Sequence, residues 1–208
     1  MSVDANYCRR AYPVTNEMGK DLAIDIGANI GGFSLAYHNT FKKIIFFEAN
    51  PETYKTTQQN LKGFDNVSGY NLAVSDEANK TIKLMNHFSK DDGSVSCSPS
   101  ITETGNKDWV EEIGYVKTID LEGIYEMIGD QQIDFLKVDC ENSEYEILLN
   151  KDLSRINHIA MELHWQMGKE KYNELLSYLE KDFTIKGDRR FVVDKNTMIY
   201  LNNKTFTK

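Results

Sequence analysis

The sequence has few cysteines and no long apolar run. Its 208 residues include three cysteines, Cys8, Cys97 and Cys140, which lie far apart and form no CxxC pair. A disulfide framework or a structural zinc site is therefore not expected, and a reducing compartment is the default. No apolar stretch approaches the roughly 18 residues of a membrane-spanning helix. The first ten residues also lack the apolar centre of a signal peptide, so we expect a cytoplasmic protein.

Positive charge is also scarce. The chain carries 24 Lys and Arg against 32 Asp and Glu, which gives a formal net charge of −8. Proteins that bind nucleic acid need a basic surface, so the negative net charge argues against a nucleic-acid partner. A chain of 208 residues can bury a full hydrophobic core without metal or disulfide support. We expect one domain over residues 1–208.

Short apolar segments alternate with helical patterns along the chain. The apolar segments predict strands at residues 21–27, 42–50, 66–76, 133–139 and 158–164, and a further extended piece at residues 81–85. Helical spacing is clearest after Asp120, where Leu121, Ile124, Tyr125 and Ile128 share one face. This alternation predicts an α/β fold, a doubly wound and mostly parallel sheet with helices on both faces.

Three parts of the chain depart from this alternation. Residues 1–20 show no regular pattern and are interpreted as a short N-terminal lead. Residues 86–110 are rich in Ser, Thr, Gly and Asp, and we expect a loop that covers the substrate. Near the C-terminus, extended pieces at 183–187, 191–194 and 197–202 have no helix between them. They predict an antiparallel hairpin at the edge of the sheet.

A glycine-rich turn follows the first predicted strand and reads Asp25-Ile-Gly27-Ala-Asn29-Ile-Gly31-Gly32. Glycines there let the backbone turn tightly and approach a ligand that lies at the carboxyl ends of the strands. A dinucleotide fingerprint would place its second glycine at position 29, where the Asn29 side chain obstructs a pyrophosphate. The turn therefore favours a ligand without pyrophosphate, such as S-adenosylmethionine, over NAD.

Acidic residues and a histidine stand at the ends of later strands. Glu48 ends the second strand, 21 residues after Gly27, where a carboxylate can accept hydrogen bonds from both hydroxyls of a ribose. NAD sites also bind the ribose through such a carboxylate, so Glu48 does not distinguish S-adenosylmethionine from NAD. Glu162 and His164 end the fifth strand on the same side of it. A histidine in this place can take a proton from a substrate hydroxyl.

Several polar residues after the fourth strand have structural interpretations. Lys137 is expected to be a charge partner inside the sheet. Ser143 and Glu146 have the spacing of a capping box, and Glu144 could serve only to complement the helix dipole. Cys140 stands between two acidic residues, which makes it a poor nucleophile.

Several segments together resemble the FkbM family of S-adenosylmethionine-dependent methyltransferases, which have the class I methyltransferase fold. They are AIDIGANIGGFSLA, FFEANPETYKTTQQNL, NLAVSD, TIDLEGI, DFLKVDCENSEYEILL and MELH, and they span roughly Leu22 to His164. The resemblance implies a seven-stranded sheet whose last hairpin is antiparallel. The family usually has Glu-Gly where this chain has Glu141-Asn142. Asparagine is the next best residue for a left-handed backbone, so the turn can survive.

The resemblance also assigns roles to residues. Asp25, Gly27, Asn29 and Gly31 would hold the methionine part of the cofactor, Glu48 its ribose, and Ala73 and Val74 would lie near the adenine. Family members typically methylate hydroxyl oxygens of sugars, glycolipids or polyketides, so the expected partner is a small-molecule or glycan hydroxyl acceptor.

A mechanism follows from this cofactor. We expect His164 to be the general base, with Asp139 and Glu141 orienting the acceptor. A divalent metal held by Asp139, Glu141 and Glu162 is possible but not favoured, because no metal-ligand spacing is distinctive. An NAD-dependent oxidoreductase and a non-catalytic cofactor- or glycan-binding module of the same fold remain alternatives.

Overall fold

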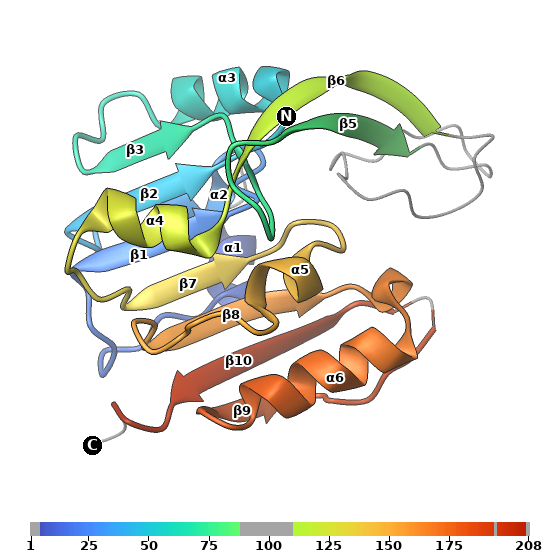
Figure 1. The fold of residues 1–208 in the computed structure, drawn as a ribbon. Helices are drawn as coiled ribbons and strands as arrows, with labels where there is room; N and C mark the ends of the chain where they lie inside the picture. Colours follow the sequence, from blue (N-terminus) through green and yellow to red (C-terminus); the bar gives the residue numbers. More distant parts are fainter. Residues whose placement is uncertain (1–4, 88–109, 194, 207–208) are drawn as a thin grey trace.

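The computed structural model, which describes residues 5–87, 110–193 and 195–206, has an α/β fold built on a seven-stranded sheet (Figure 1). In spatial order the strands are β3 (Val67–Tyr70), β2 (Lys43–Phe47), β1 (Leu22–Ile26), β7 (Phe135–Val138), β8 (His158–Leu163), β10 (Thr197–Asn203) and β9 (Phe183–Gly187). The strands from β3 to β8 are parallel, and β10 is antiparallel to both of its neighbours. The predicted fold class, including the antiparallel C-terminal hairpin, is confirmed.

Helices cover both faces of this sheet. On one face lie α4 (Leu121–Ile128), α5 (Glu144–Leu148) and α6 (Lys169–Leu179), and on the other lie α1 (Ala5–Ala11), α2 (Gly32–Tyr37) and α3 (Pro51–Asn60) (Figure 1). The alternation of side chains along β1 explains this arrangement. Leu22, Ile24 and Ile26 are buried in the cluster with α4 and α6, whereas Ala23 is buried in the cluster with α1 and α2. None of the helices in the described residues is long and apolar enough to cross a membrane.

Helix α1 lies within the segment that the sequence indicated to be an irregular lead. Its seven residues give too short a pattern to detect, and a helix of this length depends on tertiary contacts. Arg9 Nη2 donates to the carbonyl oxygen of Ala36 at 2.7 Å. The Tyr37 hydroxyl donates to the carbonyl oxygen of Tyr12 at 2.7 Å. These bonds fix the N-terminal segment against α2.

The strand predicted at residues 66–76 is wrong, because two strands in different sheets occupy it. β3 belongs to the main sheet, whereas β4 (Ala73–Val74) joins a second sheet with the order β4-β6-β5. Between β3 and β4 the Asn71 side chain donates to the carbonyl oxygens of Glu48 and Ala49, at 2.8 and 2.9 Å. These bonds turn the chain over the end of β2 and out of the main sheet.

The second sheet contains β5 (Thr81–His87), which was expected, and β6 (Val110–Ile119), which was not. Along β6, exposed Tyr115 and Lys117 alternate with buried Val116 and Thr118, a period-two pattern that could have revealed the strand. The two strands form an arm that projects from the main body in Figure 1. Residues 86, 87 and 110 of the predicted loop therefore lie in these strands, and the rest of it, residues 88–109, lies outside the described residues.

The extended piece predicted at 191–194 does not form a strand in the described residues. Val192 makes only an isolated bridge with Lys195, and Val193 is 61% exposed. Because β9 and β10 pair directly with each other, the residues between them form a connection, and most of those that the structure describes are exposed.

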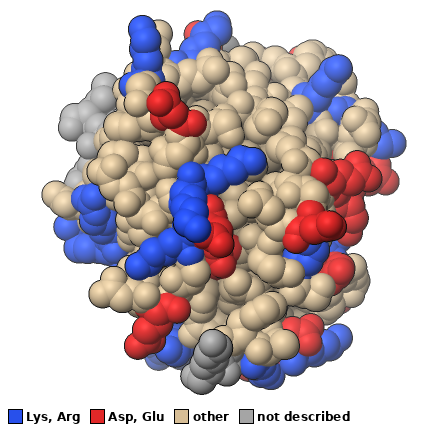
Figure 2. Space-filling model, turned by 90° about the vertical axis from the view of Figure 1, so that its left-hand side faces the viewer, with Lys and Arg blue, Asp and Glu red and all other residues tan. Residues whose placement is uncertain are grey.

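Charges of both signs share the side of the molecule opposite the carboxyl ends of the parallel strands. Figure 2 shows that Lys and Arg are interspersed there with Asp and Glu, between which lie uncharged patches. On this side the charges form no continuous field of one sign. The carboxyl ends of the strands, at the other side, hold most of the predicted site residues.

Candidate functional site

One cavity lies at the carboxyl ends of β1, β2 and β7 and gathers most of the predicted site residues. Its lining includes Gly27, Asn29, Glu48, Ala73, Val74, Asp139 and Glu141. These residues come from four parts of the chain. The main sheet brings three of them together because β1, β2 and β7 end at one edge, and Ala73 and Val74 come from β4 of the second sheet. Asp25, Gly31 and His164 do not line this cavity.

The Gly27 turn is fixed by backbone bonds to β2. The N–H groups of Gly27 and Ala28 both donate to the carbonyl oxygen of Phe47, at 3.0 Å. Gly27 has φ of 75°, and a Cβ there would lie 1.8 Å from the carbonyl oxygen of Asp139, so only glycine fits. Asn29 is also left-handed, with φ of 49°. These contacts fix the conformation of the turn, which lines the cavity through Gly27 and Asn29.

Glu48 closes the cavity on the β2 side. Its two carboxylate oxygens accept from the backbone N–H groups of Asn29 and Asn50, each at 2.8 Å. The residue is 8% exposed. Burial raises the pKa of Glu48 to about 7, although the two N–H donors oppose this shift. The Glu48 carboxylate is therefore held in one orientation, with its charge sensitive to pH near neutrality.

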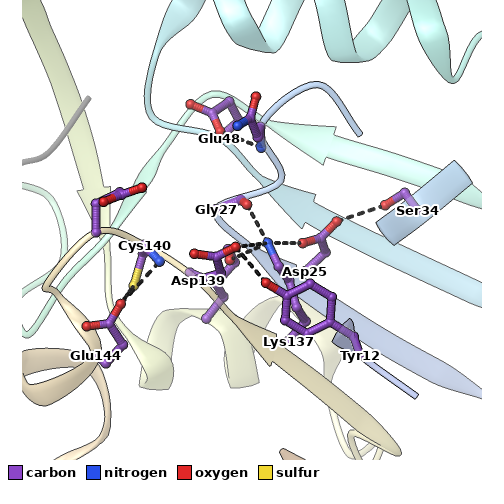
Figure 3. Close-up of polar contacts among 12 residues, drawn as sticks. Tyr12, Asp25, Gly27, Ser34, Glu48, Lys137, Asp139, Cys140 and Glu144 are labelled. Atoms are coloured by element: carbon purple, nitrogen blue, oxygen red, sulfur yellow. Dashed lines mark hydrogen bonds and ion pairs between the residues drawn. The ribbon is translucent and has the colours of Figure 1, made fainter. Parts of the chain in front are cut away.

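A buried ammonium group lies behind the Gly27 turn (Figure 3). Lys137 Nζ is 3.1 Å from Asp25 Oδ1 and 3.8 Å from Asp139 Oδ2, and it donates to the carbonyl oxygen of Gly27. Ser34 donates to the other oxygen of Asp25 at 3.1 Å. Burial alone would lower the pKa of Lys137, but Asp25 and Asp139 raise it above its ordinary value. Lys137 is thus the charge partner that the sequence predicted.

This network changes the role expected for Asp25. The residue is fully buried, on the side of β1 that faces α2, and it does not line this cavity. It acts through Lys137, which binds the backbone of the Gly27 turn. Gly31, with φ of 90°, directly precedes helix α2, and it supports the turn without lining the cavity.

Tyr12 belongs to the site but was missed by the sequence analysis. Its hydroxyl donates to Asp139 Oδ2 at 2.6 Å, and Lys137 Nζ lies 5.4 Å from the centre of its ring (Figure 3). No motif surrounds Tyr12, and its partner follows 127 residues later. Asp139 is therefore held by a phenol and an ammonium group, and its side chain keeps 27% exposure to the site.

His164 is enclosed by two carboxylates. Its Nδ1 is 2.8 Å from Glu144 Oε1, and its Nε2 is 3.4 Å from Glu141 Oε2. Burial opposes the charged ring, but Glu144 and Glu141 raise the pKa of His164 to about 9. At neutral pH the ring carries both protons and cannot accept another. The geometry therefore does not fit the predicted general base, and it makes Glu144 more than a helix-dipole partner.

The turn between β7 and α5 has a left-handed backbone at two successive residues. Glu141 has φ of 52° and Asn142 has φ of 80°. Asparagine tolerates this conformation, so the turn forms without glycine. The predicted capping box is wrong, because Ser143 makes no side-chain bond to the helix. Its φ of −92° and ψ of 2° differ from the extended backbone that a capping residue adopts.

Asp139, Glu162 and His164 converge at the ends of β7 and β8. Each offers one possible metal-ligand atom, and these atoms lie within 4.8 Å of one another. A bound cation would need a neutral imidazole, so it would have to displace a proton from His164. It would also lie close to the ammonium group of Lys137, which already neutralises Asp139. Burial, and then the charge of Asp139, raise the pKa of Glu162.

Comparisons with known proteins agree with this geometry. Residues 25–188 match the family described as the methyltransferase FkbM domain. Methyltransferase sdnD from Sordaria araneosa is 25% identical over 181 residues, which cover 75% of this chain and 66% of that protein. The chain thus spans just under two thirds of the length of this curated relative.

Solved structures share the fold. An rRNA methylase from Streptococcus thermophilus has a TM-score of 0.53 and 10% identity, over 96% of this chain and 93% of that one. TrmK from M. capricolum, solved with S-adenosyl-homocysteine, has a TM-score of 0.53 and 13% identity, over 98% of this chain and 69% of that one. At these identities the likeness concerns the fold alone, and it confirms a Rossmann-like methyltransferase architecture.

The buried Lys137 network predicts a large effect on stability. Lys137→Met leaves the Asp25 carboxylate buried and unpaired, which should lower the free energy of unfolding by about 3–5 kcal/mol. Urea denaturation measures this loss, and adding Asp25→Asn should restore part of it. The control is Lys42→Met, which breaks an exposed pair with Asp21 and should change little. A loss no larger than that of the control would contradict the network's role.

The charge state of His164 predicts an unusual titration. In protein labelled with ¹⁵N-histidine, the imidazole nitrogens of His164 should titrate with a midpoint near pH 9. Glu144→Gln removes the first partner and should move the midpoint toward the ordinary value of about 6.5. Glu170→Gln, at an exposed position of α6, should leave it unchanged. A wild-type midpoint below neutrality would show that His164 is free to act as a base.

Proposed function

Because the chain belongs to the methyltransferase FkbM domain family, we propose that it transfers a methyl group from S-adenosylmethionine to a hydroxyl oxygen of a sugar, glycolipid or polyketide-type acceptor. One observation carries the proposal. The cavity that contains Glu48 and the Gly27 turn also contains Asp139, whose carboxylate lies beside that of Glu162. A site for a nucleoside and a group of proton-accepting carboxylates therefore share one edge of the sheet.

The residues of the first cavity suit this cofactor. Glu48 would accept hydrogen bonds from the ribose hydroxyls with the lone pairs that its two N–H donors leave unused. Ala73 and Val74 supply buried apolar surface for the adenine. Gly27 and Asn29 expose backbone to the methionine part, supported from behind by Asp25 and Lys137. When bound, the sulfonium supplies an electrophilic methyl group.

The acceptor hydroxyl must lose or share its proton to become a good nucleophile. We assign this proton to Glu162, because burial makes its carboxylate a stronger base than an exposed one. Asp139, held by Tyr12 and Lys137, is placed to orient the hydroxyl. His164 is a positioning residue that holds Glu141 through its charged ring. This revises the assignment that the sequence suggested for His164.

The family match favours this proposal over an NAD-dependent oxidoreductase. A non-catalytic module of the same fold would keep the cavity around Glu48 but would not need the carboxylates of Asp139 and Glu162 beside it. The methyltransferase and the non-catalytic module differ in a single measurable property, the transfer of a methyl group.

Cofactor binding tests the role of Glu48. Calorimetry should show micromolar binding of S-adenosylmethionine, and Glu48→Gln should raise Kd about 10- to 100-fold through loss of charge-assisted hydrogen bonds. Affinity should be constant above about pH 7 and fall below it, because Glu48 then takes up a proton. Glu52→Gln, exposed in the first turn of α3, serves as the control. Tight binding of NAD without binding of S-adenosylmethionine would overturn the proposal.

Methyl transfer tests the role of Glu162. With labelled S-adenosylmethionine and a panel of glycans and methyl glycosides, the wild-type protein should label at least one acceptor in the presence of a chelator. Glu162→Gln should lower kcat about 10²- to 10⁴-fold and leave the Kd of the cofactor unchanged. A rate that stops in chelator would assign the carboxylates to a metal instead. An unchanged rate in the Gln variant would contradict the assignment of the base.

A further inference from the structure

A second cavity adjoins the first and is formed by the N-terminal segment. This α1 cavity has a volume of about 310 Å³, and its lining includes Tyr7, Cys8, Tyr12, Phe33, Lys137 and Asp139. Gly27, Asn29 and Asp139 line both cavities, so the two meet at the Gly27 turn. A cofactor with its nucleoside in the first cavity would direct its reactive end toward this boundary.

We propose that the α1 cavity binds one neutral sugar ring of the acceptor and that Tyr7 is the aromatic surface on which this ring stacks. The inference rests on the proposed function and deepens it by naming the acceptor's chemistry and the residue that selects it. It also gives α1, which the cofactor cavity does not use, a role in the reaction.

Tyr7 combines exposure with closeness to the carboxylates. Its side chain is at the mouth of the cavity and 55% exposed, although large aromatic side chains are usually buried. Partial burial, followed by the charges of Glu162 and Asp139, raises the pKa of Tyr7, which indicates that its phenol lies near both carboxylates. An aromatic face beside hydrogen-bond acceptors suits a sugar, which has an apolar C–H face and hydroxyls around its edge.

The wall that carries Tyr7 is fixed in place before any ligand binds. Tyr12, the residue that directly follows α1, is 3% exposed, and its hydroxyl donates to Asp139 at 2.6 Å. Arg9 and Tyr37 tie the same segment to α2 with bonds of 2.7 Å each. Because the segment is already ordered, binding costs less conformational entropy than closure of a loop would.

The charges around the cavity favour a neutral ligand. Lys137 is the one Lys or Arg among the described lining residues, and it is already paired with Asp25 and Asp139. An anionic ligand would meet the carboxylate of Asp139 with no uncommitted cation among the described lining residues. A phosphorylated or carboxylated acceptor is therefore disfavoured.

The size of the cavity suits a single ring. Ligand cavities range from about 300 to 1,000 Å³, and 310 Å³ lies at the lower limit. A longer glycan or a lipid could extend past Tyr7 into solvent, but only one ring would be enclosed. The contacts that select the acceptor would then be concentrated on the sugar that carries the reacting hydroxyl.

Saturation-transfer NMR on the full chain, with S-adenosyl-homocysteine present, tests this inference. The probes are methyl β-D-glucopyranoside and methyl α-L-rhamnopyranoside, and at least one should bind at millimolar concentration. Tyr7→Ala should weaken that binding about tenfold, and Tyr7→Phe, which keeps the aromatic face, should retain it within about twofold. Tyr115→Ala, at an exposed aromatic residue of β6, is the control and should have no effect.

Binding of S-adenosyl-homocysteine, measured by calorimetry on the same variants, separates the two proposals. Its Kd should be the same in wild type and Tyr7→Ala. Failure of the wild type to bind it would overturn the proposed function. Binding of neither glycoside, or binding that ignores Tyr7, would overturn this inference alone. A Tyr7→Ala variant that loses S-adenosyl-homocysteine but keeps 5′-methylthioadenosine, which lacks the amino-acid part, would also overturn it.

Discussion

The buried ammonium group of Lys137 is the interaction on which the site depends. It joins Asp25 on β1, the carbonyl oxygen of Gly27 at the turn, and Asp139 after β7. None of these groups would be stable in this place alone, because a buried charge needs a partner and a buried carbonyl needs a donor. Together they fix the boundary between two adjoining cavities. The Gly27 turn and the Asp139 carboxylate therefore keep their positions relative to each other.

Part of the chain's excess of acidic residues is concentrated at the site. Asp139, Glu141, Glu144 and Glu162 crowd the ends of β7 and β8, and their charges are partly compensated by Lys137 and by a proton on His164. The carboxylates thus favour the charged form of the His164 ring, which in our proposal positions Glu141 and is not the base. The pKa of Glu162 is also raised, by burial and then by the charge of Asp139, and the higher pKa makes its carboxylate a stronger proton acceptor. One crowded environment therefore divides the acid–base roles among neighbouring side chains.

Much of the fold and part of the site could be predicted from local sequence patterns. Buried parallel strands such as β1 and β7 appear as apolar runs, and the Gly27 turn and Glu48 follow from residue types that their positions require. The split of residues 66–76 could not be predicted, because it depends on bonds from the Asn71 side chain to another strand. The charge of His164 depends on Glu144, 20 residues away, and the role of Tyr12 depends on Asp139, 127 residues away. Local patterns carry no information on such contacts.

The bond between Tyr12 and Asp139 also has a consequence for the folding of the chain. Its two residues are 127 positions apart, and the pairing of β1 with β7 brings Asp139 to the sheet edge, so we expect the bond to form after that pairing. Contacts between distant residues form late because loop closure opposes them. Although the N-terminal segment precedes the sheet in the sequence, we expect it to dock after the sheet has formed. Until it docks, the sheet can be native while Asp139 lacks one of its two anchors, and a folding intermediate of this kind would be structured but inactive.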